Sequence, residues 1–174
     1  SLATNTETGV TLGTQLTDMA TFGGTFTANY KSVYFRKTFN VAGTIPKHLL
    51  LRVQHNDAAI VWINGTEITR FGFPPNAVGD AAFNSSAIYE RANDPWSEIV
   101  IANADALLHA GTNTIAIHGL AKPPQTRADQ EDFGIYNVFD FSVDAALTTV
   151  PETLGTPGAQ TSVFSATSGP VIRN

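Results

Sequence analysis

Residues 58–70 read AAIVWINGTEITR, an apolar run followed by Asn64-Gly65 and then by a run that alternates polar and apolar residues. Asn-Gly favours the type I′ hairpin turn, because that turn requires positive φ at both of its central residues. The stretch therefore predicts two antiparallel strands joined by a tight turn. Val61 and Ile63 point away from Trp62 along the first strand. If those two residues face the core, Trp62 faces outward, where its ring suits stacking on a sugar; the alternative is packing beneath a loop.

Other segments repeat the period of two that is typical of strands, namely residues 32–41, 48–55, 97–103, 114–118 and 135–145. Their expected inward faces comprise Val33, Phe35, Phe39 and Val41, then Leu49, Leu51 and Val53, and finally Ile135, Phe139, Phe141 and Val143. Lys37 interrupts the first of these faces, which predicts a bulge or a position at a sheet edge. Residues 104–110 have short helical character that Gly111 is suited to end.

Many short strands without a long helical pattern predict an all-β sandwich or barrel. One domain over residues 1–149 accommodates all of these strands. Residues 71–97 form a connection of a length that is unusual inside a compact domain and is often functional. Residues 150–174 are rich in Thr, Ser and Gly and lack a core pattern, which predicts a linker or a docking tail.

Composition excludes several classes of function. The chain has 174 residues and a formal net charge of −5, and it contains no Lys/Arg cluster, so no nucleic-acid partner is expected. It contains no cysteine, which excludes disulfides, thiolate catalysis and thiolate metal sites. No apolar run is long enough for a membrane span. No secretion signal is visible at the start of the chain, so we expect any such segment to have been removed.

Four segments carry a family resemblance, and they read YFRKTFNV (34–41), LLLRVQHNDAAIVWINGTEI (49–68), LLHAGTNTIAIH (107–118) and NVFDFSVD (137–144). In this order they resemble the galactose-binding-domain-like jelly roll, and they are similar to the sugar-binding domain of family 2 glycoside hydrolases. The resemblance covers about residues 30–145. It implies an antiparallel jelly-roll β-sandwich whose loops at one end hold a ligand where one is bound.

The main candidate ligand residues lie within YERANDPW, residues 89–96, in the long connection. Aromatic rings beside guanidinium, amide and carboxylate groups are the mixture with which proteins bind sugars. The candidates are Tyr89, Arg91, Asn93, Asp94 and Trp96, with Trp62 as an additional one. A tryptophan that anchors the loop without any ligand is the alternative.

An acidic loop around Asp132 has the oxygen ligands that a hard cation requires, although a solvated loop is the better explanation of this segment. The resemblance implies a structural calcium with ligands from dispersed strands, and the candidate ligands are Asp57, Asp132 and Asp140. No other cofactor is expected. His55 precedes Asn56 and Asp57, but no serine or cysteine nucleophile accompanies them, so a turn explains this triplet better than catalysis.

Together these observations predict a non-catalytic carbohydrate-binding or accessory module of a secreted, multi-domain bacterial protein. Its partner would be a polysaccharide or glycan, and its location would be extracellular or at the cell surface. The alternative is a structural or assembly protein, such as a surface-layer, fibre or phage-appendage component. In that case the sandwich acts as a spacer, and residues 150–174 dock onto a neighbouring domain or copy.

Overall fold

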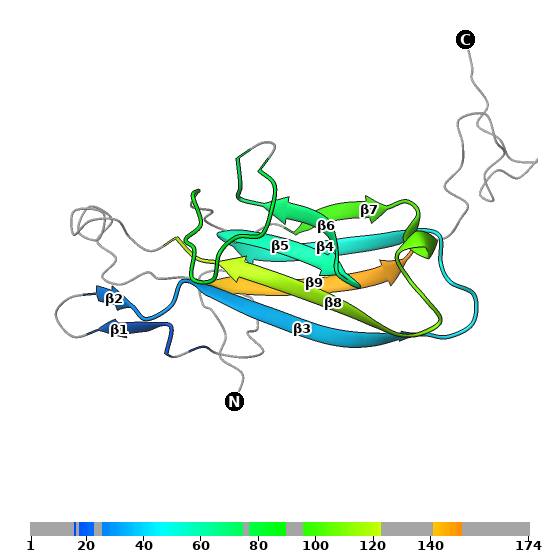
Figure 1. Ribbon diagram of the computed structural model, residues 1–174, viewed down its shortest axis with the longest axis horizontal. Coiled ribbons are helices and arrows are strands. Elements are labelled where there is room, and N and C mark those ends of the chain that lie inside the picture. The colour runs from blue at the N-terminus through cyan, green and yellow to red at the C-terminus, as the bar shows by residue number, and fades with distance from the viewer. Residues whose placement is uncertain are drawn as a thin grey trace, which may run out of the picture.

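The computed structural model describes residues 16, 18–22, 26–74, 77–89, 96–122 and 141–150, and these residues are almost entirely β-strand and loop (Figure 1). The front sheet has the strand order β3 (Ser32–Val41), β8 (Gly111–Leu120), β5 (Ala58–Ile63) and β6 (Thr66–Phe71). The back sheet has the order β7 (Ser97–Ile101), β4 (Leu49–Asn56) and β9 (Ser142–Thr149). Neighbouring strands in both sheets are antiparallel. The predicted all-β class is therefore confirmed.

Two short elements complete the described structure. The hairpin of β1 (Ala20–Phe22) and β2 (Phe26–Ala28) forms a small sheet of its own beyond one end of β3 (Figure 1). The 3₁₀ helix η1 (Ala104–Ala106) lies within the predicted helical segment, and Gly111 follows it with φ +89°. No helix among the described residues is long and apolar enough to cross a membrane.

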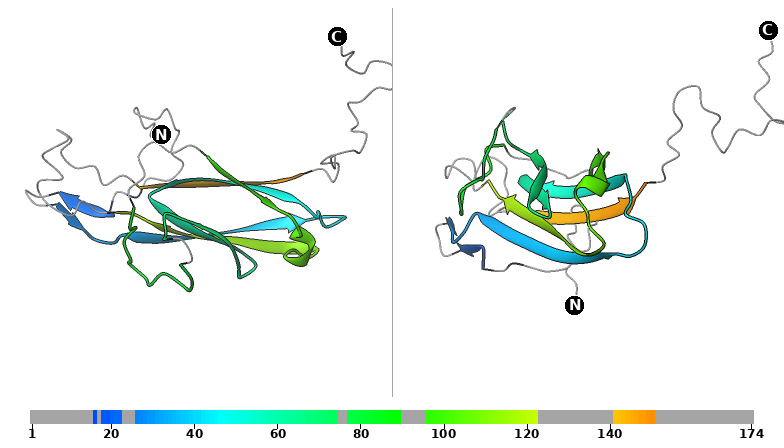
Figure 2. Two further views of the ribbon diagram at one scale, coloured as in Figure 1. Left: turned by 90° about the horizontal axis from the view of Figure 1, so that it is seen from above. Right: turned by 45° about the vertical axis from the view of Figure 1, so that its right-hand side comes forward.

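The hydrophobic core lies between the two sheets, whose inner faces meet as the predicted alternation requires. Leu51 and Val53 of β4 are fully buried from one side, and Val61 and Ile63 of β5 from the other. A fully buried aliphatic side chain of this size contributes about 1.5–3 kcal/mol through the hydrophobic effect. The views in Figure 2 show the two layers edge on, with the back sheet stacked on the front sheet. Two facing antiparallel sheets are therefore the basic architecture.

The opening hairpin has the predicted turn, since Asn64 and Gly65 adopt φ angles of +48° and +83°. β3 pairs with β8 in unbroken register over its whole length and forms an edge of the front sheet. Of the two explanations for Lys37, the edge position is therefore the correct one. Phe35 packs against the core as expected, together with Phe39 and Val41.

The closing strand differs from its prediction. β9 pairs with β4 along its full length, from Asn56 opposite Ser142 to Leu49 opposite Thr149. It therefore extends beyond residue 145, where the sequence pattern had ended it, because Leu147 continues the inward face onto the core. Ile135 and Phe139 lie outside the described residues.

Beyond β9, the amide of Val150 donates a hydrogen bond to the carbonyl of His48 at 3.1 Å. The rest of the predicted tail 150–174 lies outside the described residues. Its role as linker or docking segment stays a prediction.

The connection after β6 lies over the outer face of the front sheet, on the side away from the back sheet (Figure 2, left). Ala58 of β5 and Leu120 of β8 are cross-strand neighbours on that outer face, yet both are fully buried. Ala87 of the connection is buried against them, and Phe73 and Ala81 pack at its margin. The long connection thus covers one half of a sheet face and leaves the other half open.

Candidate functional site

The uncovered half of the front sheet contains an open hollow of about 680 Å³. Its floor and walls come from three strands, from the β5–β6 turn, from the connection and from the segment before β8. The lining residues include Tyr34, Arg36, Trp62, Asp80, Thr114, Ala116 and His118. We call this hollow the front cleft.

Strand register explains why a hollow forms at this place. Arg36 of β3 lies opposite Ala116 of β8, and Ala116 lies opposite Trp62 of β5. Neighbouring strands are about 4.8 Å apart, so the backbones at Arg36 and Trp62 are separated by roughly 10 Å. The only side chain directly between them is a methyl group. Two long side chains therefore wall a gap whose floor is Ala116.

The next cross-strand pair borders this gap. Tyr34 of β3 stacks on His118 of β8, with ring centroids 4.0 Å apart and planes 13° from parallel. Tyr34 is 57% exposed, whereas His118 is 1% exposed. Burial lowers the pKa of His118 from its ordinary value of 6.5, and the negative charge of Asp80 partly opposes this effect. His118 is therefore a neutral ring at pH 7, and its Nε2 atom is buried without a hydrogen-bond partner.

The motif residues of the hairpin and of the segment before β8 meet at one end of the cleft. The Asn64 side chain donates to the carbonyl of Leu107 at 2.9 Å and to Oδ1 of Asn113 at 2.7 Å. Its own Oδ1 accepts from the amide of Thr114 at 2.8 Å. Asn113 is fully buried and donates in turn to the carbonyls of His109 and Gly111. These residues are scaffold, because they fasten the turn to the start of β8.

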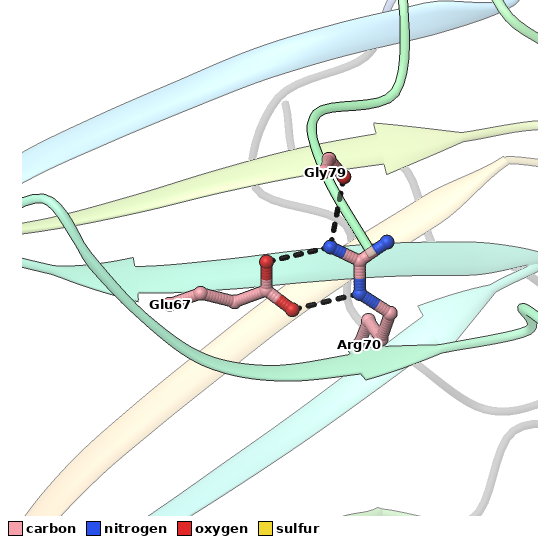
Figure 3. Close-up of polar contacts among 3 residues, drawn as sticks. All are labelled: Glu67, Arg70 and Gly79. Atoms are coloured by element: carbon pink, nitrogen blue, oxygen red, sulfur yellow. Dashed lines mark hydrogen bonds and ion pairs between the residues drawn. The ribbon is translucent and has the colours of Figure 1, made fainter. Parts of the chain in front are cut away.

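The connection is fastened to β6 by an arginine clamp (Figure 3). Nε and Nη2 of Arg70 donate to the two carboxylate oxygens of Glu67 at 2.7 and 2.6 Å. The same Nη2 donates to the carbonyl of Gly79 at 2.9 Å. Bidentate guanidinium–carboxylate pairs are geometrically specific, so the clamp fixes where the connection begins to cross the sheet. Asp80 follows Gly79 directly and lines the front cleft.

Farther along, Asn84 fastens the connection to the start of β3. Its side-chain Oδ1 accepts from the backbone amide of Lys31 at 2.6 Å, and its backbone amide donates to Oγ of Ser32 at 3.0 Å. The amide of Ala87 then donates to the carbonyl of Ala121 at 2.9 Å. These bonds hold the connection over one half of the sheet and so define the border of the open half.

The two tryptophans that the sequence predicts as ligand residues lie on opposite sides of the molecule. Trp62 is half-buried and faces outward from the front sheet, as its position between Val61 and Ile63 predicted. The ring of Trp96 lies beneath the guanidinium of Arg52, whose carbon is 5.0 Å from the ring centroid. Arg52 belongs to the outer face of the back sheet, because its neighbours Leu51 and Val53 point into the core. No common site therefore joins the tryptophans.

The other residues predicted near Trp96 are only partly described. Arg52 also pairs with Glu98 at 2.9 Å, so Trp96 lies against an existing ion pair. Tyr89 is 53% exposed. Arg91, Asn93 and Asp94 lie outside the described residues. A ligand site in residues 89–96 stays a prediction.

Asp57, a predicted calcium ligand, is 2% exposed, and its Oδ2 accepts a hydrogen bond from the amide of Lys122 at 2.6 Å. This contact ties the β4–β5 turn to the segment after β8. Asp132 and Asp140 lie outside the described residues. Among the residues that are described, no group of three or more His, Cys, Asp and Glu side chains is arranged to hold a metal. The structural calcium therefore stays a prediction.

Sequence reasoning missed most of the front cleft. Tyr34 and Arg36 alternate with the inward residues of their strand, but nothing local indicates that β8 lies beside them. Asp80 follows Gly79 in a stretch without any periodic pattern, and its placement depends on Arg70. The sequence signal that could have located the cleft is the outward alternation of Ala116 and His118, together with the placement of β8 between β3 and β5.

Comparison of the chain with models of protein families, with curated proteins and with solved structures finds no match. The resemblance to the galactose-binding-domain-like family therefore rests on the sequence motifs alone.

The buried neutral state of His118 predicts a pH dependence of stability. Its pKa is lower in the folded protein than in the unfolded chain, so the unfolded chain binds its proton more readily. The free energy of unfolding is therefore expected to fall as the pH drops through about 6.5 toward the folded-state pKa. His118→Phe keeps a ring for Tyr34 to stack on and removes the titration. Urea denaturation of both proteins between about pH 7.5 and about pH 5.5 measures the difference, and equal pH slopes would contradict the assignment.

Proposed function

We propose that this domain binds carbohydrate without catalysing a reaction, as an accessory module of a secreted multi-domain protein. The observation that carries the proposal is the front cleft, where the rings of Trp62 and Tyr34 line the same open hollow as Arg36 and Asp80. Aromatic rings contact the apolar face of a sugar, while charged groups form hydrogen bonds to its hydroxyls. A sheet face with both kinds of group suits a saccharide better than it suits a purely apolar ligand.

Two features support a binding role over a catalytic one. The described residues that line the cleft include one carboxylate, that of Asp80. Glycoside hydrolysis by the usual mechanisms needs two carboxyl groups that flank the scissile bond. His118 is buried under Tyr34, where it is poorly placed to exchange protons with a ligand. The cleft therefore offers contacts to a sugar more readily than acid–base chemistry.

The proposal retains the galactose-binding-domain-like jelly roll as the family and an extracellular or cell-surface location. Both rest on the motif resemblance. The hydrogen bonds that join Asn64 to Asn113 and Thr114 are compatible with it, because they give the motif residues a shared structural role.

A structural or assembly role is a second proposal, and one observation favours it. The connection exposes large apolar side chains, with Val78 at 89% and Phe83 at 73%. Exposed apolar groups of this kind are typical of surfaces that contact another protein. In this alternative the sandwich is a spacer, and residues 150–174 or the connection contact a neighbouring copy.

The size of the particle in solution tests the assembly role. If neighbouring copies associate through the tail, light scattering shows an oligomer for the full chain and a monomer after removal of residues 151–174. If they associate through the connection, the paired change of Val78 and Phe83 to Ser dissociates the oligomer instead. A monomer for the unaltered chain at high concentration counts against both versions.

Substitution of the cleft tryptophan tests carbohydrate binding. Trp62→Ala is expected to weaken binding to a retained polysaccharide by about 2 kcal/mol, or roughly thirtyfold in Kd, because truncation of an aromatic anchor has about that cost. Affinity electrophoresis against a panel of polysaccharides identifies the ligand, and titration calorimetry gives the Kd. Circular dichroism checks that the variant is folded.

Two further variants make this test specific. Trp96→Ala removes a ring of the same kind on the opposite side of the molecule and is expected to bind as the unaltered protein does. Ala116→Leu fills the floor of the cleft without removing any contacting group, and it is expected to abolish binding. Loss of binding in Trp96→Ala but not in Trp62→Ala moves the site to residues 89–96. If the unaltered chain retains no polysaccharide, the proposal fails.

A further inference from the structure

Arg36 and Asp80 are two opposite charges among the described residues of the front cleft. Within the part of the chain that the structure describes, Arg36 and Asp80 form no ion pair, although both line the cleft. The nearby charges differ in this respect, since Glu67 and Arg70 are paired with each other at 2.6 Å. Of the described residues that line the cleft, these two therefore present a guanidinium and a carboxylate outside any ion pair.

These two charges reach the cleft from different elements. Arg36 belongs to β3, at the edge of the front sheet, and lies across Ala116 from Trp62. Asp80 comes from the connection, directly after the carbonyl that Arg70 of β6 holds. The hydrogen bond to Glu67 is the main cause of the raised pKa of Arg70, and the charge of Asp80 adds to it. The charge of Asp80 also opposes the lowering of the pKa of His118 by burial, so its carboxylate acts on the β6 and β8 side. The cation and the carboxylate therefore enter the cleft from different sides.

Near neutral pH, the guanidinium and carboxylate groups among the described lining residues of the front cleft contribute one charge of each sign. His118 is neutral there because burial lowers its pKa. The pair of Glu67 and Arg70 contributes one charge of each sign. Arg36 and Asp80 then cancel in number, although the described residues show no ion pair between them. A ligand with a net charge gains attraction at one of these groups and meets repulsion at the other.

Building on the proposed carbohydrate function, we propose that the front cleft selects neutral saccharides, seated over Ala116 between Arg36 and Trp62. A hydroxyl group both donates and accepts hydrogen bonds, so neighbouring hydroxyls of one sugar satisfy both charged groups. The guanidinium of Arg36 donates to hydroxyl oxygens, and the carboxylate of Asp80 accepts from hydroxyl hydrogens. Such charge-assisted hydrogen bonds are stronger than neutral ones and do not require a charged ligand. A uronic acid is attracted by Arg36 but repelled by Asp80, and an amino sugar is attracted by Asp80 but repelled by Arg36, so neither gains a net charge attraction in the cleft.

Charge removal at each group tests the selection. Titration calorimetry compares the unaltered protein with Arg36→Gln and Asp80→Asn, against a neutral glucan or mannan, polygalacturonate and chitosan. Each variant is expected to weaken binding of the neutral polymer by about tenfold or more, because a hydrogen bond to a charged group contributes about 1.5–3 kcal/mol. Raising the NaCl concentration from about 0.05 M to about 0.5 M is expected to change the Kd of the neutral polymer by less than about twofold.

Matched controls are Lys37→Gln and Asp105→Asn, which remove the same charges at exposed positions outside the cleft and are expected to leave binding unchanged. The inference is overturned if polygalacturonate binds best, Asp80→Asn strengthens that binding and Arg36→Gln abolishes it. It is equally overturned if chitosan binds best, Arg36→Gln strengthens that binding and Asp80→Asn abolishes it. Failure of the unaltered protein to bind any of the polymers would instead remove the carbohydrate function on which the inference rests.

Discussion

The register of β5 on β8 is the constraint on which the rest of the structure depends. A slip of one residue would send Trp62 into the core and Val61 to the surface, because side chains alternate along a strand. The Asn64 side chain prevents this slip, since it bonds both Asn113 and the amide of Thr114 at the start of β8. The same bonds bring Ala116 beside Trp62. One hydrogen-bond network, which joins Asn64 of the turn to the buried Asn113 and to Thr114, thus determines both the core and the floor of the front cleft.

The connection between β6 and β7 determines which half of the outer face of the front sheet is covered. The clamp of Arg70 and the bonds of Asn84 fasten it over one half of the front sheet, where Ala58 and Leu120 become fully buried. The other half keeps Tyr34 and Arg36 exposed and Trp62 partly exposed. Loops that carry function are positioned by a rigid scaffold, and in the front cleft the strands themselves supply lining residues such as Tyr34, Arg36 and Trp62. The cleft therefore combines strand residues, which are rigid, with Asp80 from the connection.

Local patterns in the sequence predicted much of the fold. The Asn-Gly turn, the inward alternation of Leu51 and Val53 and the outward position of Trp62 are confirmed, because short-range sterics and burial determine them. The cleft was not predictable in the same way. It requires β3 beside β8, a pairing of segments far apart in the chain, and it requires a loop position set by a clamp. The polar neighbours of Trp96 in the sequence favour it over Trp62 as a ligand residue, and no local pattern indicates that Arg52 from a distant strand lies over its ring.

The central claim is that recognition takes place on the outer face of the front sheet. Nuclear magnetic resonance of the ¹⁵N-labelled full chain, during titration with an oligosaccharide of a polymer that the protein binds, tests this claim most directly. Chemical-shift changes are expected at the amide groups of Arg36, Asp80 and Ala116 and at the indole N–H of Trp62, which come together only in the folded sheet. Changes confined to Tyr89 and Trp96, with the front cleft unaffected, would contradict it.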